Sequence, residues 1–323
     1  MTTNNAARIK TITEALNQAV SNARNINGGK IANYIPELTK VDTNYLGAAI
    51  LLSSGELITA GDNSDYLFTM QSVSKLVLLI GLMEEFGASK VFSWIKVEPS
   101  EQSFSSIRHL DQYGPVPSNP LINAGAIALC SRIPGNSVEQ QEWISKWTNK
   151  LFGDTIGFNE SVFYSELQHS DRNRSLAYLM KSTGVLAREV EEVLIPYIML
   201  CSFQLNVKQA AYLPMILSNG GVASDGKRII SEETSNQVVA IMATCGLYNE
   251  SGMHLVKTGL PAKSGVSGLI VAVATCRAGI AVSSPYINSK GTSIRGHALL
   301  MELSKTLDWH FAAPNCGTQY CSD

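Results

Sequence analysis

The 323-residue chain has no run rich in lysine or arginine, and its formal net charge is only −2. A nucleic-acid partner would require a positive stripe that neutralises phosphates. No basic stretch interleaved with aromatic residues supplies one. The composition therefore argues against a protein that binds nucleic acid.

Long hydrophobic runs are also lacking. The longest apolar stretch, residues 268–282, is interrupted by Arg277 and is too short to cross a bilayer. The first ten residues are polar and amide-rich, without the apolar core and small-residue cleavage site of a secretory signal. We expect a soluble, cytoplasmic protein with no membrane partner.

Cysteine and histidine are few and scattered. None of the six cysteines forms a C-x-x-C pair. Cys316 and Cys321 lie close together, but a reducing cytosol disfavours a disulfide. No two of the five histidines have the i,i+4 spacing of metal ligands on a helix. We therefore expect neither a metal nor a cofactor.

The hydrophobic pattern predicts strands towards both ends of the chain and helices between them. A helix over residues 6–24 precedes a hairpin formed by residues 45–52 and 57–60. Two more strands and a closing helix are predicted over residues 266–275, 278–283 and 293–307. The helices predicted between them cover residues 73–86, 122–132, 138–152, 174–181, 208–218 and 234–244. Terminal segments that build one sheet around a helical insert give an α+β fold, and the short connections make the sheet mainly antiparallel.

The whole chain, residues 1–323, is expected to form a single domain. Its sheet-containing subdomain would comprise about residues 1–70 and 225–323. A helical subdomain would comprise about residues 71–224.

The motif Ser-x-x-Lys occurs three times, beginning at Ser72, Ser93 and Ser224. On a helix this spacing places both side chains on one face. A neutral lysine there can take the proton of the serine and activate it as a nucleophile. The match at Ser224 contains an Asp-Gly turn pair, and the match at Ser93 lies in a short amphipathic segment. Both indicate surface positions.

Ser72 and Lys75 instead open the most apolar helix of the chain. Burial disfavours the charged ammonium and can lower a lysine pKa by roughly 3–5 units, which would give a base near neutral pH. The start of the helix would also bring backbone N–H groups near an oxyanion. A catalytic base and a buried, paired structural lysine both fit this pattern.

Serine amidases of the penicillin-recognising kind add a second Ser or Tyr element and a Lys-Thr-Gly or Lys-Ser-Gly strand. Lys257-Thr258-Gly259 is followed by Leu-Pro, which favours a loop. Lys263-Ser264-Gly265 leads into an apolar run beginning at Val266 and is the better candidate for the strand. The N–H of Val266 could then join that of Ser72 as an oxyanion donor. Tyr248 is either a proton shuttle or a packing residue at a turn.

Together these motifs resemble the serine-dependent glutaminase family over most of the chain. The matching blocks, in order, are residues 29–38, 71–75 (QSVSK), 119–127 (NPLINAGAI), 164–166, 171–173, 197–202 and 248–266. The resemblance implies a β-lactamase/transpeptidase-like fold. It also implies hydrolysis of L-glutamine to L-glutamate and ammonia through a γ-glutamyl-serine intermediate, with water as the second substrate. A homo-oligomer, dimer or tetramer, would be typical.

The resemblance also assigns roles to individual residues. Ser72 would be the nucleophile, Lys75 its base and Tyr248 the proton shuttle towards departing ammonia. Glu166 would bind the α-amino group of the substrate. The remaining substrate contacts would come from Tyr34, Asn123, Asn173, Tyr197 and Val266. Without the resemblance, a helix cap for Asn123, a surface ion pair of Glu166 with Arg172 or Arg174, and a core position for Tyr197 would suffice.

Two other functions remain open from the sequence. A β-lactamase-like or peptidase-like serine hydrolase would use the same Ser72 and Lys75. A catalytically inactive amino-acid sensor would keep the pocket and lose turnover. Glu166, Asn173 and Tyr197 argue against the first, since a lactam or peptide need not present a free α-amino group. The intact Ser72, Lys75 and Tyr248 argue against the second.

Overall fold

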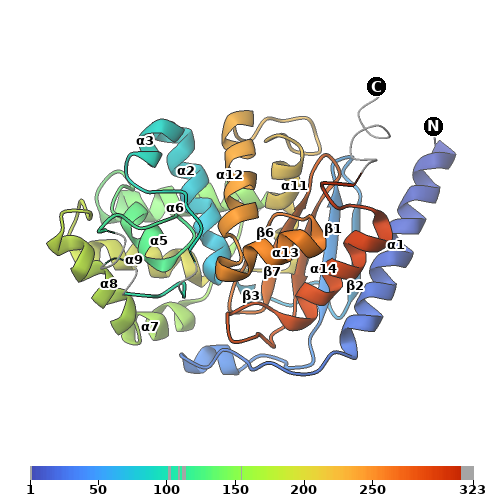
Figure 1. Ribbon diagram of the computed structural model, residues 1–323, viewed down its shortest axis with the longest axis horizontal. Coiled ribbons are helices and arrows are strands. Elements are labelled where there is room, and N and C mark those ends of the chain that lie inside the picture. The colour runs from blue at the N-terminus through green and yellow to red at the C-terminus, as the bar shows by residue number, and fades with distance from the viewer. Residues whose placement is uncertain (1, 101–102, 108–109, 111–113, 154, 314–323) are drawn as a thin grey trace.

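A five-stranded antiparallel sheet brings the two ends of the chain together (Figure 1). The computed structural model describes residues 2–100, 103–107, 110, 114–153 and 155–313. The strand order is β2-β1-β8-β7-β6, so the N-terminal hairpin pairs with the C-terminal strands through β1 and β8. These strands are β1 Gly47–Leu52, β2 Leu57–Gly61, β6 Ala262–Ser264, β7 Leu269–Ala274 and β8 Ala278–Ser283. The predicted antiparallel sheet is confirmed.

The central strands β1, β7 and β8 are buried on both faces, and their side chains alternate between two cores. On β1, Ala48, Ile50 and Leu52 face one core, whereas Ala49 and Leu51 face the other. Apart from Ser283 at the end of β8, every position of these strands is a small or branched apolar residue, which fits a sheet that is covered by helices on both sides.

One face of the sheet is covered by the first and last helices of the described chain, α1 and α14, which lie side by side (Figure 1). The opposite face carries α10 and α11. A Cβ on Gly279 of β8 would lie 2.1 Å from the backbone nitrogen of Met215, so α11 rests directly on that strand. These helices are α1 Thr2–Arg24, α10 Val207–Ala210, α11 Tyr212–Ser218 and α14 Ile294–Leu307. Beside the sheet lie α12 Glu232–Cys245 and α13 Ser251–Thr258.

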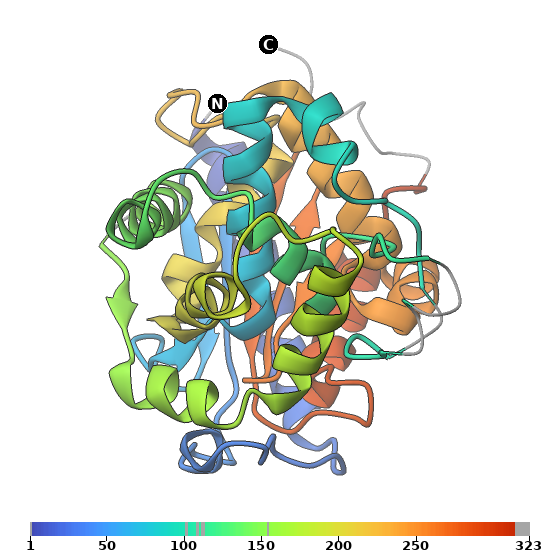
Figure 2. The same ribbon diagram turned by 90° about the vertical axis from the view of Figure 1, so that its left-hand side faces the viewer.

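The remaining helices pack around α2 to form the helical part of the molecule, which faces the viewer in Figure 2. The first nine residues of α2, Lys75 to Met83, are all buried, as its apolar sequence predicts. The helices of this part are α2 Lys75–Phe86, α3 Ala88–Phe92, α5 Asn123–Cys130, α6 Ser137–Phe152, α7 Glu160–Gln168, α8 Asp171–Ser182 and α9 Val190–Ser202.

A small three-stranded sheet ties the segment before α2 to the segments that precede α7 and follow α9. Its order is β3-β5-β4, with β3 Phe68–Thr69, β4 Gly157–Phe158 and β5 Phe203–Leu205. The N–H of Met70, just after β3, donates to the carbonyl of Phe203 at 2.7 Å. This bond fixes the chain immediately before the 3₁₀ helix η2, Gln71–Ser74, which carries Ser72.

Three predicted elements differ from the structure. The helix predicted over residues 208–218 is divided into α10 and α11, because Pro214 has no N–H with which to continue the first helix. The strand predicted from Val266 begins only at Leu269, after a turn that Gly268 closes with φ +93°. Lys257 and Thr258, expected in a loop, end α13, and Gly259 terminates that helix in the left-handed conformation.

Other expectations remain untested. The division into two subdomains of one domain stays a prediction. Cys316 and Cys321 lie outside the described residues. Within the described ranges, no helix combines the length and apolarity needed to cross a membrane.

Candidate active site

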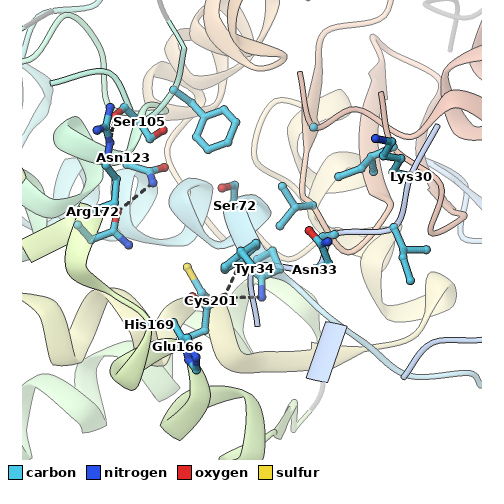
Figure 3. A pocket seen from close by; sticks show the side chains of 18 of the residues that line it. Lys30, Asn33, Tyr34, Ser72, Ser105, Asn123, Glu166, His169, Arg172 and Cys201 are labelled. Atoms are coloured by element: carbon cyan, nitrogen blue, oxygen red, sulfur yellow. Dashed lines mark hydrogen bonds between the residues drawn. The ribbon is translucent and has the colours of Figure 1, made fainter. Parts of the chain in front are cut away.

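A cavity of about 940 Å³ lies between the helical part and the edge of the large sheet. The segment from Gly29 to Tyr34 lines it on one side, and the loop between β8 and α14 lies beside that segment. Figure 3 shows Ser72 in the middle of this pocket, with Asn123 and Arg172 on one side and Lys30 on the other. Seven of the predicted site residues line it: Tyr34, Ser72, Asn123, Glu166, Asn173, Tyr197 and Val266. The other two, Lys75 and Tyr248, are buried.

The turn that presents Ser72 has a strained backbone. Gln71, the residue before it, has φ +47°, which L-residues rarely adopt. Such conformations cost about 1–3 kcal/mol and cluster at functional sites. Ser72 is the second residue of η2, where a backbone N–H has no partner within the helix. That N–H is therefore free to face a ligand in the pocket.

Lys75 begins α2 and is only 2% exposed. Its Nζ donates to Oδ1 of Asn123 at 2.7 Å and to the carbonyl of Leu121 at 3.2 Å. Burial lowers the pKa of Lys75 to about 7, so a large share of the amine is neutral near pH 7. A neutral amine has two N–H donors and one lone pair, and these two acceptors occupy both donors. The lone pair is left for a further partner.

Asn123 is the first residue of α5, and its side chain connects Lys75 to the pocket. Its Nδ2 donates to Oδ1 of Asn173 on α8 at 3.1 Å, which turns its oxygen towards Lys75. Asn123 makes these contacts in place of a helix cap. The two hydrogen bonds of the Asn123 side chain therefore link α2, α5 and α8.

Tyr248 begins the 3₁₀ helix η3, Tyr248–Glu250, and also has a left-handed backbone, with φ +56°. The hydroxyl of Ser251 holds this conformation by donating to the carbonyl of Tyr248 at 2.8 Å. The Tyr248 hydroxyl forms a hydrogen bond with the Ser72 side chain. Burial raises the pKa of Tyr248, although the bond to Ser72 opposes the shift, so the phenol stays protonated at neutral pH.

Lys263, on β6, is a second buried lysine at this site, and the sequence-based choice of site residues missed it. Its Nζ lies 4.4 Å from the centre of the Tyr248 ring and donates to the Tyr248 hydroxyl at 3.3 Å. Burial, reinforced by the charge of Lys75, lowers its pKa well below the ordinary lysine value. Its place in the Lys-Ser-Gly motif was the signal that could have identified it.

Val266 lies in the turn between β6 and β7, rather than in the strand expected there. Among the described residues, its N–H donates to no other backbone carbonyl. The preceding residue, Gly265, packs closely on η2: a Cβ there would lie 2.8 Å from the carbonyl oxygen of Met70 and 3.6 Å from the nitrogen of Ser72. The turn therefore brings the Val266 backbone next to that of Ser72.

Glu166, on α7, is 7% exposed and makes no ion pair within the described part of the chain. Its Oε1 accepts from the hydroxyl of Tyr34 at 2.6 Å and from Nε2 of Gln71 at 3.2 Å. Burial raises the pKa of Glu166, and these two hydrogen bonds oppose that shift. A buried carboxylate that faces a cavity without a cation is well suited to receive one from a ligand.

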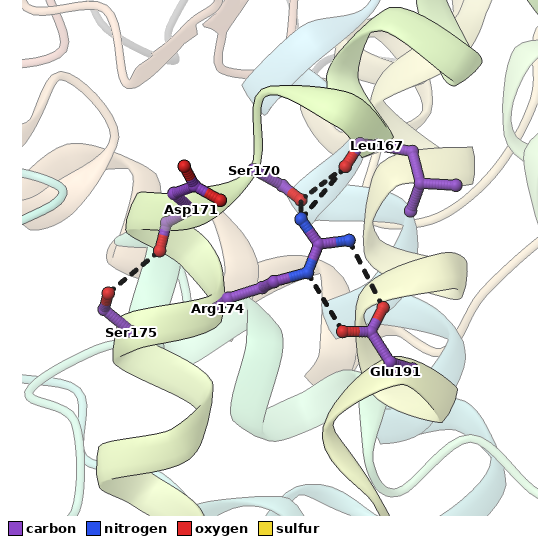
Figure 4. Close-up of polar contacts among 6 residues, drawn as sticks. All are labelled: Leu167, Ser170, Asp171, Arg174, Ser175 and Glu191. Atoms are coloured by element: carbon purple, nitrogen blue, oxygen red, sulfur yellow. Dashed lines mark hydrogen bonds and ion pairs between the residues drawn. The ribbon is translucent and has the colours of Figure 1, made fainter.

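The surface ion pair considered for Glu166 does not form. Arg174 instead pairs with Glu191 at 2.9 Å and also donates to the carbonyl of Leu167 and the hydroxyl of Ser170 (Figure 4). Arg172 donates through Nε to the carbonyl of Ser105. The contacts of Arg174 fix the turn between α7, which carries Glu166, and α8, which carries Asn173.

Comparison with known proteins supports the same conclusion. The family model described as glutaminase matches residues 29–311. The chain belongs to the glutaminase family. A glutaminase of Legionella pneumophila (strain Lens) is 50% identical over 287 residues, which cover 88% of this chain and 93% of that protein.

Solved structures agree with this membership. One described as the probable glutaminase ybaS superposes with a TM-score of 0.90 at 34% identity, covering 94% of this chain and 98% of its own. Another, described as Mglu in its glutamate form, has a TM-score of 0.87 at 31% identity and covers 93% of this chain and 69% of its own. The predicted fold class, an α+β fold of the β-lactamase type, is confirmed.

Two further residues of the pocket were not among the predicted site residues. Gln71 and Cys201 both line the cavity. Gln71 contacts Tyr34 and Glu166, and its left-handed backbone is a feature that no sequence pattern reveals. Burial raises the pKa of Cys201 to about 12, so its thiol is protonated and poorly reactive at neutral pH. Among the described residues, no group of three or more His, Cys, Asp or Glu is placed to hold a metal ion.

Proposed function

We propose that this glutaminase hydrolyses L-glutamine to L-glutamate and ammonia through a γ-glutamyl ester on Ser72. The observation that carries the proposal is the environment of Lys75. This lysine is buried three residues after a pocket-facing serine, its pKa is about 7, and both N–H donors of its neutral form have acceptors. A base with these properties can take a proton from Ser72 at neutral pH.

In the acylation step, Nζ of Lys75 takes the Ser72 proton while Oγ attacks the side-chain amide carbon of glutamine. The N–H groups of Ser72 and Val266 stabilise the oxyanion. The carbon–nitrogen bond then breaks, and Tyr248 delivers the proton that ammonia needs to leave. Lys75 restores the proton to Tyr248.

In the deacylation step, water attacks the ester carbon and gives a proton to Lys75. The ester bond breaks, Ser72 regains its proton, and glutamate is released. Lys263, which donates to the Tyr248 hydroxyl, favours a fixed orientation of the phenol throughout the cycle.

Recognition of the free amino acid would come from the other end of the pocket. The α-ammonium group of glutamine is the cation that Glu166 lacks in the described structure, and Asn173 and Tyr197 would bind the α-carboxylate. Tyr34 is 46% exposed as a residue, whereas its hydroxyl points inward to Glu166, so this side chain would cover the bound substrate. The shorter side chain of asparagine would lose about 1–3 kcal/mol of transition-state binding in such a pocket.

The proposal is tested by ammonia and glutamate release from L-glutamine by the purified wild-type protein and by Ser72→Ala. The matched control is Ser224→Ala, which alters another Ser-x-x-Lys serine at an exposed position. Turnover is expected in the wild type and the control and not in Ser72→Ala. Full turnover by Ser72→Ala would exclude Ser72 as the nucleophile. Glutamine binding by a folded wild type without turnover would favour the sensor, and acylation of Ser72 by penicillin would favour the β-lactamase-like alternative.

The cytoplasmic location and the homo-oligomer implied by the resemblance remain predictions. Sedimentation equilibrium of the purified protein measures the second. A monomer across the micromolar range would contradict it.

A further inference from the structure

The loop between β8 and α14, residues 284–293, forms one side of the pocket through Ile287, Asn288, Ser289 and Gly291. It is closed internally, because Oδ1 of Asn288 accepts from the N–H groups of Lys290 and Thr292 at 2.9 and 3.1 Å. From outside, the loop is held by Ile287, which exchanges two backbone hydrogen bonds with Lys30 at 2.9 and 3.0 Å, and by the side chain of Glu250.

Glu250 holds this loop through its carboxylate. Nδ2 of Asn288 donates to both carboxylate oxygens, at 2.9 and 3.1 Å, and the hydroxyl of Thr292 donates to Oε2 at 2.8 Å. Within the described ranges, Glu250 makes no ion pair that would offer an alternative partner. Hydrogen bonds to a charged acceptor are stronger than neutral ones, so this contact is a firm attachment.

Glu250, which holds the loop, lies two residues after Tyr248 in the chain. Glu250 is the last residue of η3, the short helix that Tyr248 begins in its strained conformation. Its own N–H donates to the carbonyl of Leu247 at 3.0 Å, so the carboxylate and the tyrosine belong to one tight turn. A displacement of Glu250 would be transmitted to Tyr248.

Between Asn288 and Thr292, the two residues that Glu250 binds, the loop approaches the proposed oxyanion site. A Cβ on Gly291 would lie 3.4 Å from Cγ1 of Val266 and 3.7 Å from Cε1 of Phe104. The Phe104 ring in turn packs on the Tyr248 ring, with centroids 4.8 Å apart. Gly291 thus sits next to both Val266 and the aromatic pair.

From this arrangement we infer that Glu250 is a positioning residue for the reaction. By tying the loop of residues 284–293 to the Tyr248 turn, it sets the separation between the proton donor Tyr248 and the oxyanion donor Val266. The inference rests on the proposed function and adds to it a residue that touches neither the substrate nor the reacting atoms. Glu166 and Asn173, which are proposed to bind the α-amino and α-carboxylate groups of the substrate, lie on other elements. The contact of Glu250 with the loop therefore governs the chemical step rather than substrate affinity.

The test compares the steady-state kinetics of Glu250→Ala, Glu250→Gln, Thr292→Val and the double variant Glu250→Ala/Thr292→Val. For Glu250→Ala we expect kcat to fall by about tenfold, because small displacements of reacting groups are costly. KM for glutamine should stay within about threefold of the wild type. Glu250→Gln keeps an oxygen acceptor and should recover part of kcat. The double variant should be no slower than Glu250→Ala, because both single changes remove the same contact.

The matched control is Glu84→Ala. Glu84 is also half-buried and accepts two hydrogen bonds, from the N–H and the hydroxyl of Ser231, but it does not line the pocket. The Glu84→Ala variant should lose stability and keep its kcat per folded molecule. The folded fraction is measured by urea unfolding, which does not depend on the active site. An unchanged kcat in folded Glu250→Ala, or effects of Glu250→Ala and Thr292→Val that add fully, would overturn the inference while leaving the wild-type glutaminase activity intact. Absence of activity in the wild type would instead refute the proposed function.

Discussion

The hydroxyl of Tyr34 lies 2.6 Å from Oε1 of Glu166, although 132 residues separate them in the chain. Tyr34 comes from the segment before the large sheet, and Glu166 from α7 in the helical part. Although Tyr34 is partly exposed, the enclosure of its hydroxyl and the neighbouring carboxylate raise the pKa of Tyr34 well above its ordinary value, so the phenol is the donor. The contact closes the pocket over the site at which the α-ammonium group is proposed to bind.

Tyr34→Phe should therefore weaken substrate binding more than it slows chemistry. We expect KM for glutamine to rise by about tenfold, corresponding to about 1.4 kcal/mol, while kcat changes little. Steady-state kinetics at pH 7 measure both constants. Tyr164→Phe, at an exposed position of α7, is the control. A loss confined to kcat would show that Tyr34 acts on the reacting amide instead.

The pKa of Lys75 predicts how the activity of the wild-type enzyme depends on pH. The base is active when neutral, and its pKa is about 7, so kcat/KM should rise as the pH increases through about 7. Asn123→Asp would place a negative charge on the atom that now contacts Nζ at 2.7 Å. That charge would favour the ammonium form and move the rise to higher pH.

The corresponding measurement is kcat/KM from pH 5.5 to 9.5 for both proteins. Asn123→Asp should be impaired most at pH 6–7 and recover as the pH rises. Asn123→Ala is the comparison, because it removes the contact without adding charge. If Asn123→Asp loses the same factor at every pH, Lys75 is not the titrating base.

Gly265→Ala should move the two proposed oxyanion donors, the N–H groups of Ser72 and Val266, away from each other. The new methyl group would lie 2.8 Å from the Met70 carbonyl oxygen, closer than real Cβ contacts, so the turn carrying Val266 must move away from η2. We expect kcat to fall by about a hundredfold, because preorganised oxyanion donors are sensitive to position. Gly252→Ala is the control, since a Cβ there meets no atom within 4 Å. An unchanged kcat in folded Gly265→Ala would mean that Val266 is not a donor.

His254 should make the protein sensitive to acid. It is 2% exposed, and burial, together with the nearby His297, lowers its pKa from 6.5 to about 4. The unfolded chain then binds a proton that the folded chain does not. The resulting stability is fully present above pH 6.5 and is lost as the pH falls through about 4, by about 3 kcal/mol in total.

Urea unfolding at pH 7 and pH 4.5 tests this linkage. His254→Gln keeps a donor for the carbonyl of Leu260, which the ring nitrogen now contacts at 3.0 Å. The difference in unfolding free energy between the two pH values should shrink by about 2 kcal/mol in this variant. His310→Gln should leave the difference unchanged. Equal pH dependence in His254→Gln and the wild type would assign the acid sensitivity to other groups.

Much of the fold was predictable from local patterns. The apolar sequence of α2 indicated burial, and burial indicated the low pKa of Lys75. The division between α10 and α11 could also have been predicted, because Pro214 has no N–H to donate to the carbonyl of Ala210 and fits the first turn of a new helix. Periodicity and proline placement are local properties, and they appear in the sequence directly.

The assembly of the site was less accessible. The contact between Asn123 and Asn173 joins residues 50 apart, and no periodic pattern marks it. Lys263 stood in a recognised motif, but its contact with Tyr248 depends on how the turn that carries Tyr248 packs beside β6. The left-handed backbones of Gln71 and Tyr248 are set by tertiary packing, because neither residue type favours that conformation. These features required the fold, or the resemblance to a known family.

The most direct test of the central claim is to identify the group acylated during turnover. The enzyme is mixed with L-glutamine, quenched in acid, digested and examined by mass spectrometry. A γ-glutamyl group on the peptide containing Ser72, absent from Ser72→Ala, is the predicted result. A γ-glutamyl group on another residue, or undiminished ammonia release by Ser72→Ala, would contradict the account.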